Sequence, residues 1–316
     1  MRARFAPSPT GDLHLGNART ALLAWLQLRQ AGGAFVLRVE DLDFGRTRPG
    51  IMERQLADLR WLGLDWDEGP DVGGPCGPYL QSARQERYTQ ALERLSDQGA
   101  LYPCFCSRRE IAAAASAPHE ADEEGPAYPG SCRALTLADR ADREAARGTA
   151  ALRFRAPPGE VCFDDLCQGR RTFRPADEVG DFVVRRKDGV AAYQLAVTVD
   201  DAAMGITHVL RGADLLASTA RQLLLYRALG LRPPIWTHVP LLLGSDGARL
   251  AKRHGAVTLS ELRGRGVAPS SVVGWLASTC GLADAGETLE PAQLIDRFAL
   301  DRIPRSPQRL PLLPWR

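Results

Sequence analysis

Lysine is almost absent from this chain of 316 residues, because only Lys187 and Lys252 among its 40 basic residues are lysines. Arginine supplies nearly every other positive charge, so a retained lysine indicates a position that needs a compact ammonium group on a flexible stem. Net charge is also scarce, at +2, which is too little to indicate a nucleic-acid partner by itself. Arginine clusters such as Arg170-Arg171 could form a basic face, or simply a solvated surface.

The sequence lacks any apolar run long enough to span a bilayer. Its first residues lead into Pro7 and Pro9, not into the apolar core of a signal peptide. The seven cysteines are an odd number without a secretory signal, which argues against a disulfide framework and leaves reduced thiols or metal ligands. With 45% hydrophobic and 25% charged residues, the composition is that of a globular protein. We therefore expect a cytoplasmic monomer without membrane association.

A loop that contains a histidine joins a predicted strand to a predicted helix near the N-terminus. Residues 2–6 alternate as a strand does, and apolar residues recur at helical spacing from about 17 to 30. The loop between them runs from Pro7 to Asn17. Free backbone N–H groups and the helix dipole favour an anion at such a helix start. The loop therefore predicts a phosphate site at His14, although its prolines and glycines alone would predict only a turn.

A second glycine-rich loop lies about three-quarters of the way along the chain. Residues 236–243 are predicted to form a strand, and the loop from Gly244 to Gly255 that follows carries Lys252. An ammonium group on a flexible stem can follow the moving charge of a phosphate more easily than a planar guanidinium can. The loop therefore predicts a phosphate contact at Lys252.

The order of the predicted elements indicates an α/β fold with a Rossmann-like parallel sheet. Strand 2–6, helix 17–30 and strand 35–39 form one βαβ unit, whose crossover should be right-handed. The second half of the sheet is predicted from strands 193–199, 206–210 and 236–243, with a helix over 215–229. Further helices are expected over 258–264, 269–279 and 291–299. Ligands of such a sheet bind at the C-terminal ends of its strands.

The region from about 100 to 180 is interpreted as an insertion between the two halves of the sheet. It contains an Ala/Glu-rich stretch over 111–125 and a predicted strand over 151–155. Four regions are therefore predicted. They are a first catalytic half over 1–100, an inserted subdomain over 101–180, a second catalytic half over 181–255, and a short helical C-terminal region over 256–316.

Charged side chains are predicted at the ligand-facing edge of the sheet. Arg4 and Arg211 come at the ends of strands, and a guanidinium can pair with a substrate carboxylate through two parallel hydrogen bonds. Glu40 could receive an ammonium group, and Tyr193 could donate a hydrogen bond or wall the pocket. Each residue alone is typical of a surface ion pair or of core packing. Their shared edge favours a ligand pocket, in which a guanidinium could pair with a carboxylate.

The predicted insertion contains three cysteines at metal-ligand spacing. Cys104, Cys106 and Cys132 could supply three thiolates to a tetrahedral zinc ion, although buried cysteines without a metal are common. The candidates for a fourth ligand are His119, Tyr128, Cys162 and Cys167. Histidine or cysteine is chemically favoured, because a tyrosine must lose its proton to the field of the metal.

The loop around His14 resembles the HIGH signature of class I aminoacyl-tRNA synthetases, and its Pro-Ser-Pro-Thr-Gly lead-in resembles the glutamyl branch of that class. The loop around Lys252 is similar to the KMSKS signature of the same branch, with Arg249 and Ala251 as departures from it. The resemblance implies an ATP site that consists of His14, Gly16, Asn17 and Lys252, with His14 and Lys252 as catalytic residues. The implied glutamate ligands are Arg4, Phe5, Ala6, Pro7, Ser8, Glu40, Tyr193 and Arg211.

The cysteine pattern narrows the resemblance to the glutamyl-queuosine tRNA(Asp) synthetases, which are short paralogues of glutamyl-tRNA synthetase. Their zinc pattern matches Cys104, Cys106, Tyr128 and Cys132, which implies that Tyr128 is the fourth ligand of a structural Zn²⁺. Only 63 residues follow Arg253, whereas full glutamyl-tRNA synthetases continue into a large helical domain.

This resemblance implies an enzyme that activates L-glutamate with ATP and Mg²⁺ and transfers it to queuosine in the anticodon of tRNA(Asp). Two alternatives stay open. One is a truncated glutamyl-tRNA synthetase that charges a tRNA 3′ end, and the other is a non-catalytic zinc-bearing RNA-binding module.

Overall fold

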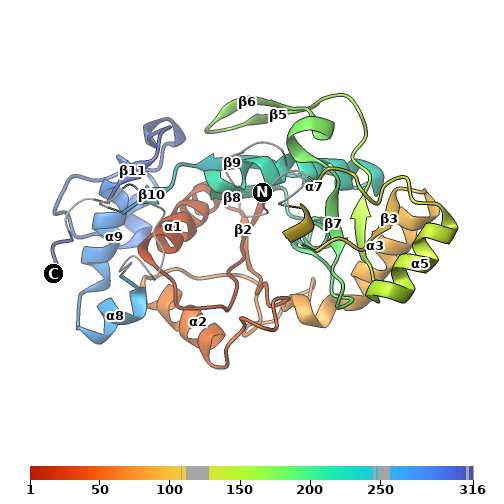
Figure 1. Ribbon diagram of the computed structural model, residues 1–316. Helices are drawn as coiled ribbons and strands as arrows, with labels where there is room; N and C mark the ends of the chain where they lie inside the picture. The colour runs from red at the N-terminus through yellow and green to blue at the C-terminus, as the bar shows by residue number, and fades with distance from the viewer. Residues whose placement is uncertain (108, 112–127, 245–246, 248–256, 311–312, 316) are drawn as a thin grey trace.

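A six-stranded sheet forms the centre of the computed structural model, which describes residues 1–107, 109–111, 128–244, 247, 257–310 and 313–315 (Figure 1). The strands in spatial order are β2 (Ala34–Leu37), β1 (Arg2–Phe5), β8 (His208–Gly212), β9 (Ile235–Val239), β5 (Val161–Asp165) and β6 (Gly169–Phe173). Neighbouring strands are parallel except for the antiparallel pair of β5 and β6. The predicted α/β class with a mostly parallel sheet is confirmed.

Helices cover both faces of this sheet, because successive side chains of a strand point to opposite faces. Phe35 and Leu37 on β2 pack in one core with helix α1 (Leu15–Gln30). Val36, between them, packs in a second core with α6 (Tyr193–Ala203) and α7 (Leu216–Ala228). The sheet is therefore the middle layer of three.

The two ends of the molecule carry different attachments (Figure 1). At one end, helices α8 (Leu259–Gly264) and α9 (Pro269–Ser278) share the core of α1. At the other end lies an antiparallel sheet in the order β3 (Leu101–Cys104), β4 (Ala151–Phe154) and β7 (Phe182–Arg185). Helix α5 (Leu137–Arg147) lies beside it and starts with a Thr136 capping box.

Shorter elements connect these parts. They are α2 (Ile51–Trp61), α3 (Gln85–Asp97), the parallel pair β10 (Leu242–Leu243) and β11 (Gln308–Arg309), a π-helical turn over Pro175–Val179, and the 3₁₀ turns Gln81–Arg84, Ala213–Leu215, Pro291–Leu294 and Leu300–Arg302. No helix among the described residues is both long and apolar enough to cross a membrane.

Three predicted elements are wrong. The predicted strand 193–199 is part of helix α6, whose residues from Gln194 to Asp201 are all buried, so no exposed polar face marks a helical period in the sequence. The predicted strand 236–243 is two strands in separate sheets, because β9 ends before Pro240. The predicted helix 291–299 is only the short turn Pro291–Leu294.

The segment predicted as an insertion, 101–180, contributes strands to two sheets. It supplies β3 and β4 to the small antiparallel sheet, and it also supplies β5 and β6 to the central sheet. Asp165 at the end of β5 is paired in register with Trp236 on β9. Part of this segment therefore belongs to the layer that also carries β1 and β8, and the limits of the inserted subdomain stay a prediction.

Candidate active site and cysteine cluster

The side chain of His14 caps the first turn of helix α1. Its Nδ1 accepts backbone N–H groups from Gly16 at 3.1 Å and Asn17 at 3.3 Å, and the Asn17 side-chain oxygen accepts the His14 backbone N–H at 3.2 Å. Because Nδ1 is an acceptor, the ring proton of the neutral imidazole is on Nε2. His14 therefore fixes the helix start that the sequence predicts as the phosphate site, and it satisfies two of the free N–H groups itself.

Both described flanks of the Lys252 loop contact the beginning of α1. On the C-terminal flank, His14 forms a bridge with Thr258, and the Leu259 backbone N–H donates to the Leu13 carbonyl at 2.8 Å. On the N-terminal flank, the Arg19 guanidinium of α1 donates to the Pro240 carbonyl at 2.6 Å. The predicted residues Lys252, Arg249 and Ala251 themselves lie outside the described residues.

Arg211 presents a buried cation with an unused donor. It lies at the end of β8, where its Nε donates to His238 Nε2 at 3.0 Å and its Nη2 donates to the Thr219 hydroxyl at 2.8 Å. Its Nη1 is buried and has no hydrogen-bond partner among the described residues. Burial lowers the pKa of Arg211 from its ordinary value, and the nearby Arg4 adds to this effect. A carboxylate ligand would supply the missing acceptor and the opposite charge.

Arg4, by contrast, already has a carboxylate partner. Its Nε and Nη2 donate to the two oxygens of Asp201 on α6 at 3.2 and 3.4 Å. The buried Arg38 donates to the same carboxylate at 2.7 Å and to Glu40 at 3.1 Å. Burial acts to raise the pKa of Asp201, but Arg4 and Arg38 outweigh it and lower that pKa. Arg38 and Asp201 therefore hold Arg4 and Glu40 in one charged network.

The predicted glutamate ligands lie in a common electrostatic neighbourhood. Burial raises the pKa of Tyr193 to about 12, with Arg211, Glu40 and Arg4 also acting on it. Burial likewise raises the pKa of Glu40 against the opposing charges of Arg38 and Arg4. The structure therefore brings the four predicted polar residues together.

The segment of predicted ligands after β1 runs beside Glu40. The Phe5 carbonyl accepts the Arg38 backbone N–H, and the Pro7 carbonyl accepts the Glu40 backbone N–H, both at 3.0 Å. The Ser8 carbonyl accepts the Gln55 side-chain amide at 3.0 Å. Residues 5–8, which include Ala6, therefore continue from β1 along the same edge of the sheet as Glu40.

Sequence reasoning missed three buried polar residues that support this pocket. Arg38 and Asp201 were not predicted because the charge pair joins β2 to a helix that was expected to be a strand. His238 is fully buried, and its Nδ1 lies 2.6 Å from a carboxylate oxygen of Asp165. Burial, with a contribution from Arg211, lowers the pKa of His238 to about 4. The only sequence signal was the pair Asp200-Asp201 after an apolar run.

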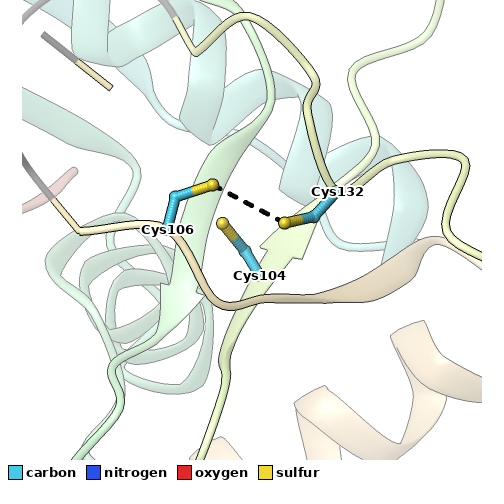
Figure 2. Close-up of side chains that lie close together, drawn as sticks. All are labelled: Cys104, Cys106 and Cys132. Carbon is cyan, nitrogen blue, oxygen red and sulfur yellow. Dashed lines mark hydrogen bonds between the residues drawn. The ribbon is translucent and has the colours of Figure 1, made fainter. Parts of the chain in front are cut away.

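Three cysteine sulfurs gather at the end of the small antiparallel sheet, and Figure 2 shows them pointing toward one another. The sulfurs of Cys104, Cys106 and Cys132 all lie within 4.8 Å of one another, and Cys106 and Cys132 are 3.6 Å apart. The Tyr128 hydroxyl oxygen lies 3.5 Å from the Cys104 sulfur and 3.7 Å from that of Cys106. Four donor atoms therefore face a common centre that could hold a metal ion.

Two of the other candidates for a fourth ligand, Cys162 and Cys167, do not join this cluster. Cys162 contacts Thr172 across β5 and β6, and Cys167 follows β5 in the central sheet. His119 lies outside the described residues. The Tyr128 oxygen also accepts the Cys132 backbone N–H at 2.8 Å, and the Arg153 guanidinium lies 3.8 Å from the centre of the tyrosine ring. Burial and the neighbouring cysteines raise the pKa of Tyr128, so its oxygen would ionise only in the field of a metal ion.

Comparisons with known proteins identify the family of the chain. The family model described as tRNA synthetases class I (E and Q), catalytic domain, matches residues 1–307. The chain is 62% identical to the glutamyl-Q tRNA(Asp) synthetase of Symbiobacterium thermophilum, over 98% of this chain and 95% of that protein. It is 50% identical to the protein of the same name in Nitratidesulfovibrio vulgaris, over 97% of this chain and 94% of that one.

A solved structure of a glutamate tRNA ligase has a similar fold. A glutamate tRNA ligase from Elizabethkingia meningosepticum, in complex with its amino acid, is similar with a TM-score of 0.84 and 31% identity. The match covers 98% of this chain and 67% of that ligase. This chain belongs to the class I tRNA synthetases of the glutamate and glutamine group, and within them to the glutamyl-Q tRNA(Asp) synthetases.

Proposed function

We propose that this chain activates L-glutamate with ATP to form glutamyl-adenylate. A hydroxyl of queuosine in the anticodon of tRNA(Asp) then attacks the adenylate and takes the glutamyl group, and AMP leaves. One observation carries the proposal. The buried Arg211, with its unused Nη1, ends a strand that is the parallel neighbour of β1, and β1 leads into the histidine-capped start of α1. An amino-acid carboxylate at Arg211 and phosphates near His14 would therefore meet at one edge of the sheet.

Activation of glutamate depends on the alignment of its α-carboxylate with ATP more than on acid–base catalysis. The α-carboxylate of glutamate is ionised at neutral pH, so it attacks the α-phosphate of ATP directly and pyrophosphate leaves. Arg211 pairs with the side-chain carboxylate of the substrate, and Glu40 receives its ammonium group. Mg²⁺ bound to ATP would supply positive charge that stabilises the leaving pyrophosphate. His14 and Lys252 stabilise the charge that develops on the phosphates.

The chain geometry supports the role given to Lys252. Thr258, which bridges to His14, follows Lys252 by six residues. Six residues span at most about 20 Å when fully extended. The N-terminal flank of the loop contacts α1 through the hydrogen bond from Arg19 to the Pro240 carbonyl. Lys252 therefore belongs to a loop that starts and ends beside the proposed phosphate site.

The metal in the cysteine cluster is a structural Zn²⁺ in this proposal. A tetrahedral ion with Zn–S bonds of about 2.3 Å gives sulfur-to-sulfur edges of about 3.8 Å. The edge of 3.6 Å between Cys106 and Cys132, and the sulfur-to-oxygen edges of 3.5 and 3.7 Å to Tyr128, fit that size. With three thiolates and a phenolate as ligands, no position is left for a substrate, so the ion stabilises the fold.

Isotope exchange between pyrophosphate and ATP tests the activation step. We expect exchange that depends on L-glutamate and is absent with L-glutamine or L-aspartate. A chain that catalyses no glutamate-dependent exchange, with or without tRNA, would be the non-catalytic RNA-binding module instead. Charging of a tRNA 3′ end would identify the truncated glutamyl-tRNA synthetase.

A further inference from the structure

A buried relay of three side chains reaches the glutamate pocket from strand β5. Asp165 at the end of β5 contacts His238 on β9, and His238 contacts Arg211 on β8. Asp165 and His238 have fully buried side chains, and Arg211 is almost completely buried. The relay therefore joins three strands of the central sheet and ends at the guanidinium whose Nη1 has no hydrogen-bond partner in the described part of the chain.

Hydrogen-bond geometry fixes the tautomer of His238. The Nε–H of Arg211 can only donate, so His238 Nε2 at 3.0 Å must accept and carries no proton. The single proton of the neutral ring is then on Nδ1, where it donates to Asp165 Oδ2 at 2.6 Å. The Thr219 hydroxyl accepts from Arg211 Nη2 and lies 3.1 Å from the same His238 Nε2. The Arg211 contact therefore requires an unprotonated Nε2, and the Thr219 hydroxyl, which can donate or accept, is compatible with it.

The backbone around Asp165 makes its two oxygens unequal. Oδ1 accepts backbone N–H groups from Cys167 at 3.0 Å and Gln168 at 2.8 Å, while Oδ2 accepts the ring N–H of His238. The His238 backbone N–H lies 3.1 Å from both oxygens. An amide in place of this carboxylate would have to keep its oxygen at the Oδ1 position, and its NH₂ would face His238 Nδ1.

We propose that Asp165 and His238 are positioning residues for Arg211. By holding the proton on Nδ1, Asp165 leaves His238 Nε2 as the acceptor that orients the Arg211 guanidinium, so that Nη1 points at the substrate carboxylate. This inference rests on the proposed role of Arg211 in binding glutamate. It also gives the segment between the two sheet halves a function in the amino-acid pocket, because β5 carries Asp165.

Asp165→Asn tests the relay because it reverses the hydrogen bonding without changing the side-chain shape. The new amide would donate to Nδ1, move the ring proton to Nε2, and set it against the Arg211 Nε–H. We expect KM for glutamate in ATP–pyrophosphate exchange to rise about 10- to 100-fold, as for the loss of a hydrogen bond to a charged group. We expect kcat and KM for ATP to stay within about threefold. Asp164→Asn, on an exposed neighbour in β5, is the matched control and should change none of these values.

Two replacements of His238 separate its role as a hydrogen-bond acceptor from its role in packing. His238→Gln can place a carbonyl oxygen near the Nε2 position, so KM for glutamate should stay within about threefold of the original. His238→Asn reaches only the Nδ1 position and leaves Arg211 Nε without an acceptor, so its KM should rise as in Asp165→Asn. A chain with His238→Gln has no imidazole tautomer to reverse. Adding Asp165→Asn to that variant should therefore raise KM for glutamate by less than about a third of the rise that it causes when His238 is present. An equal effect in both backgrounds would overturn the relay.

Nitrogen-15 NMR of the histidine rings reads the tautomer directly, whatever the substrate is. His238→Gln assigns the signal among the five histidines. We expect a protonated Nδ1 in the unaltered chain and a protonated Nε2 in Asp165→Asn. A protonated Nε2 in the unaltered chain would refute the inference. Absence of any glutamate-dependent exchange, together with the expected tautomers, would instead refute the proposed substrate and leave the orientation of Arg211 by His238 in place.

Discussion

The proposed glutamate pocket and the cysteine cluster satisfy their polar groups in opposite ways. In the pocket, Arg4 and Arg38 are compensated by Asp201 and Glu40, and one guanidinium nitrogen of Arg211 is left for a ligand. In the cluster, three sulfurs and a phenol oxygen face one another. Electron-rich atoms at such distances need a cation between them once they ionise. The proposed pocket is therefore preorganised by the protein alone, whereas the cluster could hold a metal ion.

Loss of a bound metal should have the largest effect. The loss of structure that follows should be confined to the region of the cluster. We expect about one zinc per chain in protein purified without chelator, and less than about a tenth of that in Cys132→Ser, because a three-ligand site is left. Amide protection in β3 and β4 should fall, while α1 and β1 stay protected.

Cys162→Ser is the matched control, since this cysteine lies outside the cluster, and it should keep its zinc. Full zinc content in Cys132→Ser would mean that the three sulfurs do not form a metal site. Equal loss of protection in α1 would mean that the pocket is not independent of the cluster.

Lys252→Ala should have the next largest effect, on the chemical step of the pocket. We expect kcat of ATP–pyrophosphate exchange to fall about 10²- to 10³-fold with little change in KM for glutamate, as for a group that acts chiefly in the transition state. Lys187→Ala removes the only other lysine, which donates to the Phe105 carbonyl, and should leave kcat within about threefold. An equal loss in kcat and in glutamate affinity would contradict the assignment of Lys252 to the phosphate site.

Arg211→Ala should act on binding instead. Loss of the unpaired guanidinium donor and its charge should raise KM for glutamate by about 10- to 100-fold and change KM for ATP much less. Arg170→Ala, on the exposed strand β6, serves as the control for loss of one positive charge. An unchanged glutamate requirement in Arg211→Ala would exclude this residue from the pocket.

The smallest predicted effect is a pH dependence of stability. The pKa of His238 is about 4 in the folded chain and near 6.5 when unfolded, so the unfolded chain takes up the proton first as the pH falls. Stability is therefore full above about pH 6.5 and is lost as the pH falls toward 4, by about 2 kcal/mol between pH 7 and pH 5. Urea unfolding should show a shallower pH dependence for His238→Gln over this range. Identical curves for the two proteins would contradict a buried neutral His238.

The sequence was sufficient for features that depend on local pattern. The helix after the His14 loop, the strands around Arg4 and Arg211, and the spacing of the cysteines all follow from periodicity or motif. The choice of Tyr128 needed the family resemblance, because residue chemistry alone favoured histidine or cysteine. In the structure, its oxygen is close to two of the sulfurs.

Contacts between distant segments could not be predicted in this way. A buried helix such as α6 shows no amphipathic period, so Asp201 could not be assigned to a face opposite Arg4 and Arg38. The relay through Asp165 and His238 depends on β5 pairing beside β9, and strand order is not encoded in local pattern. These long-range pairs are what orient the residues that the motifs identify.

The most direct test of the proposed function is the transfer of labelled glutamate to purified tRNA. We expect transfer to tRNA(Asp) that contains queuosine, and none to tRNA(Asp) without queuosine or to tRNA(Glu). Charging of tRNA(Glu), or equal labelling of tRNA(Asp) with and without queuosine, would contradict it.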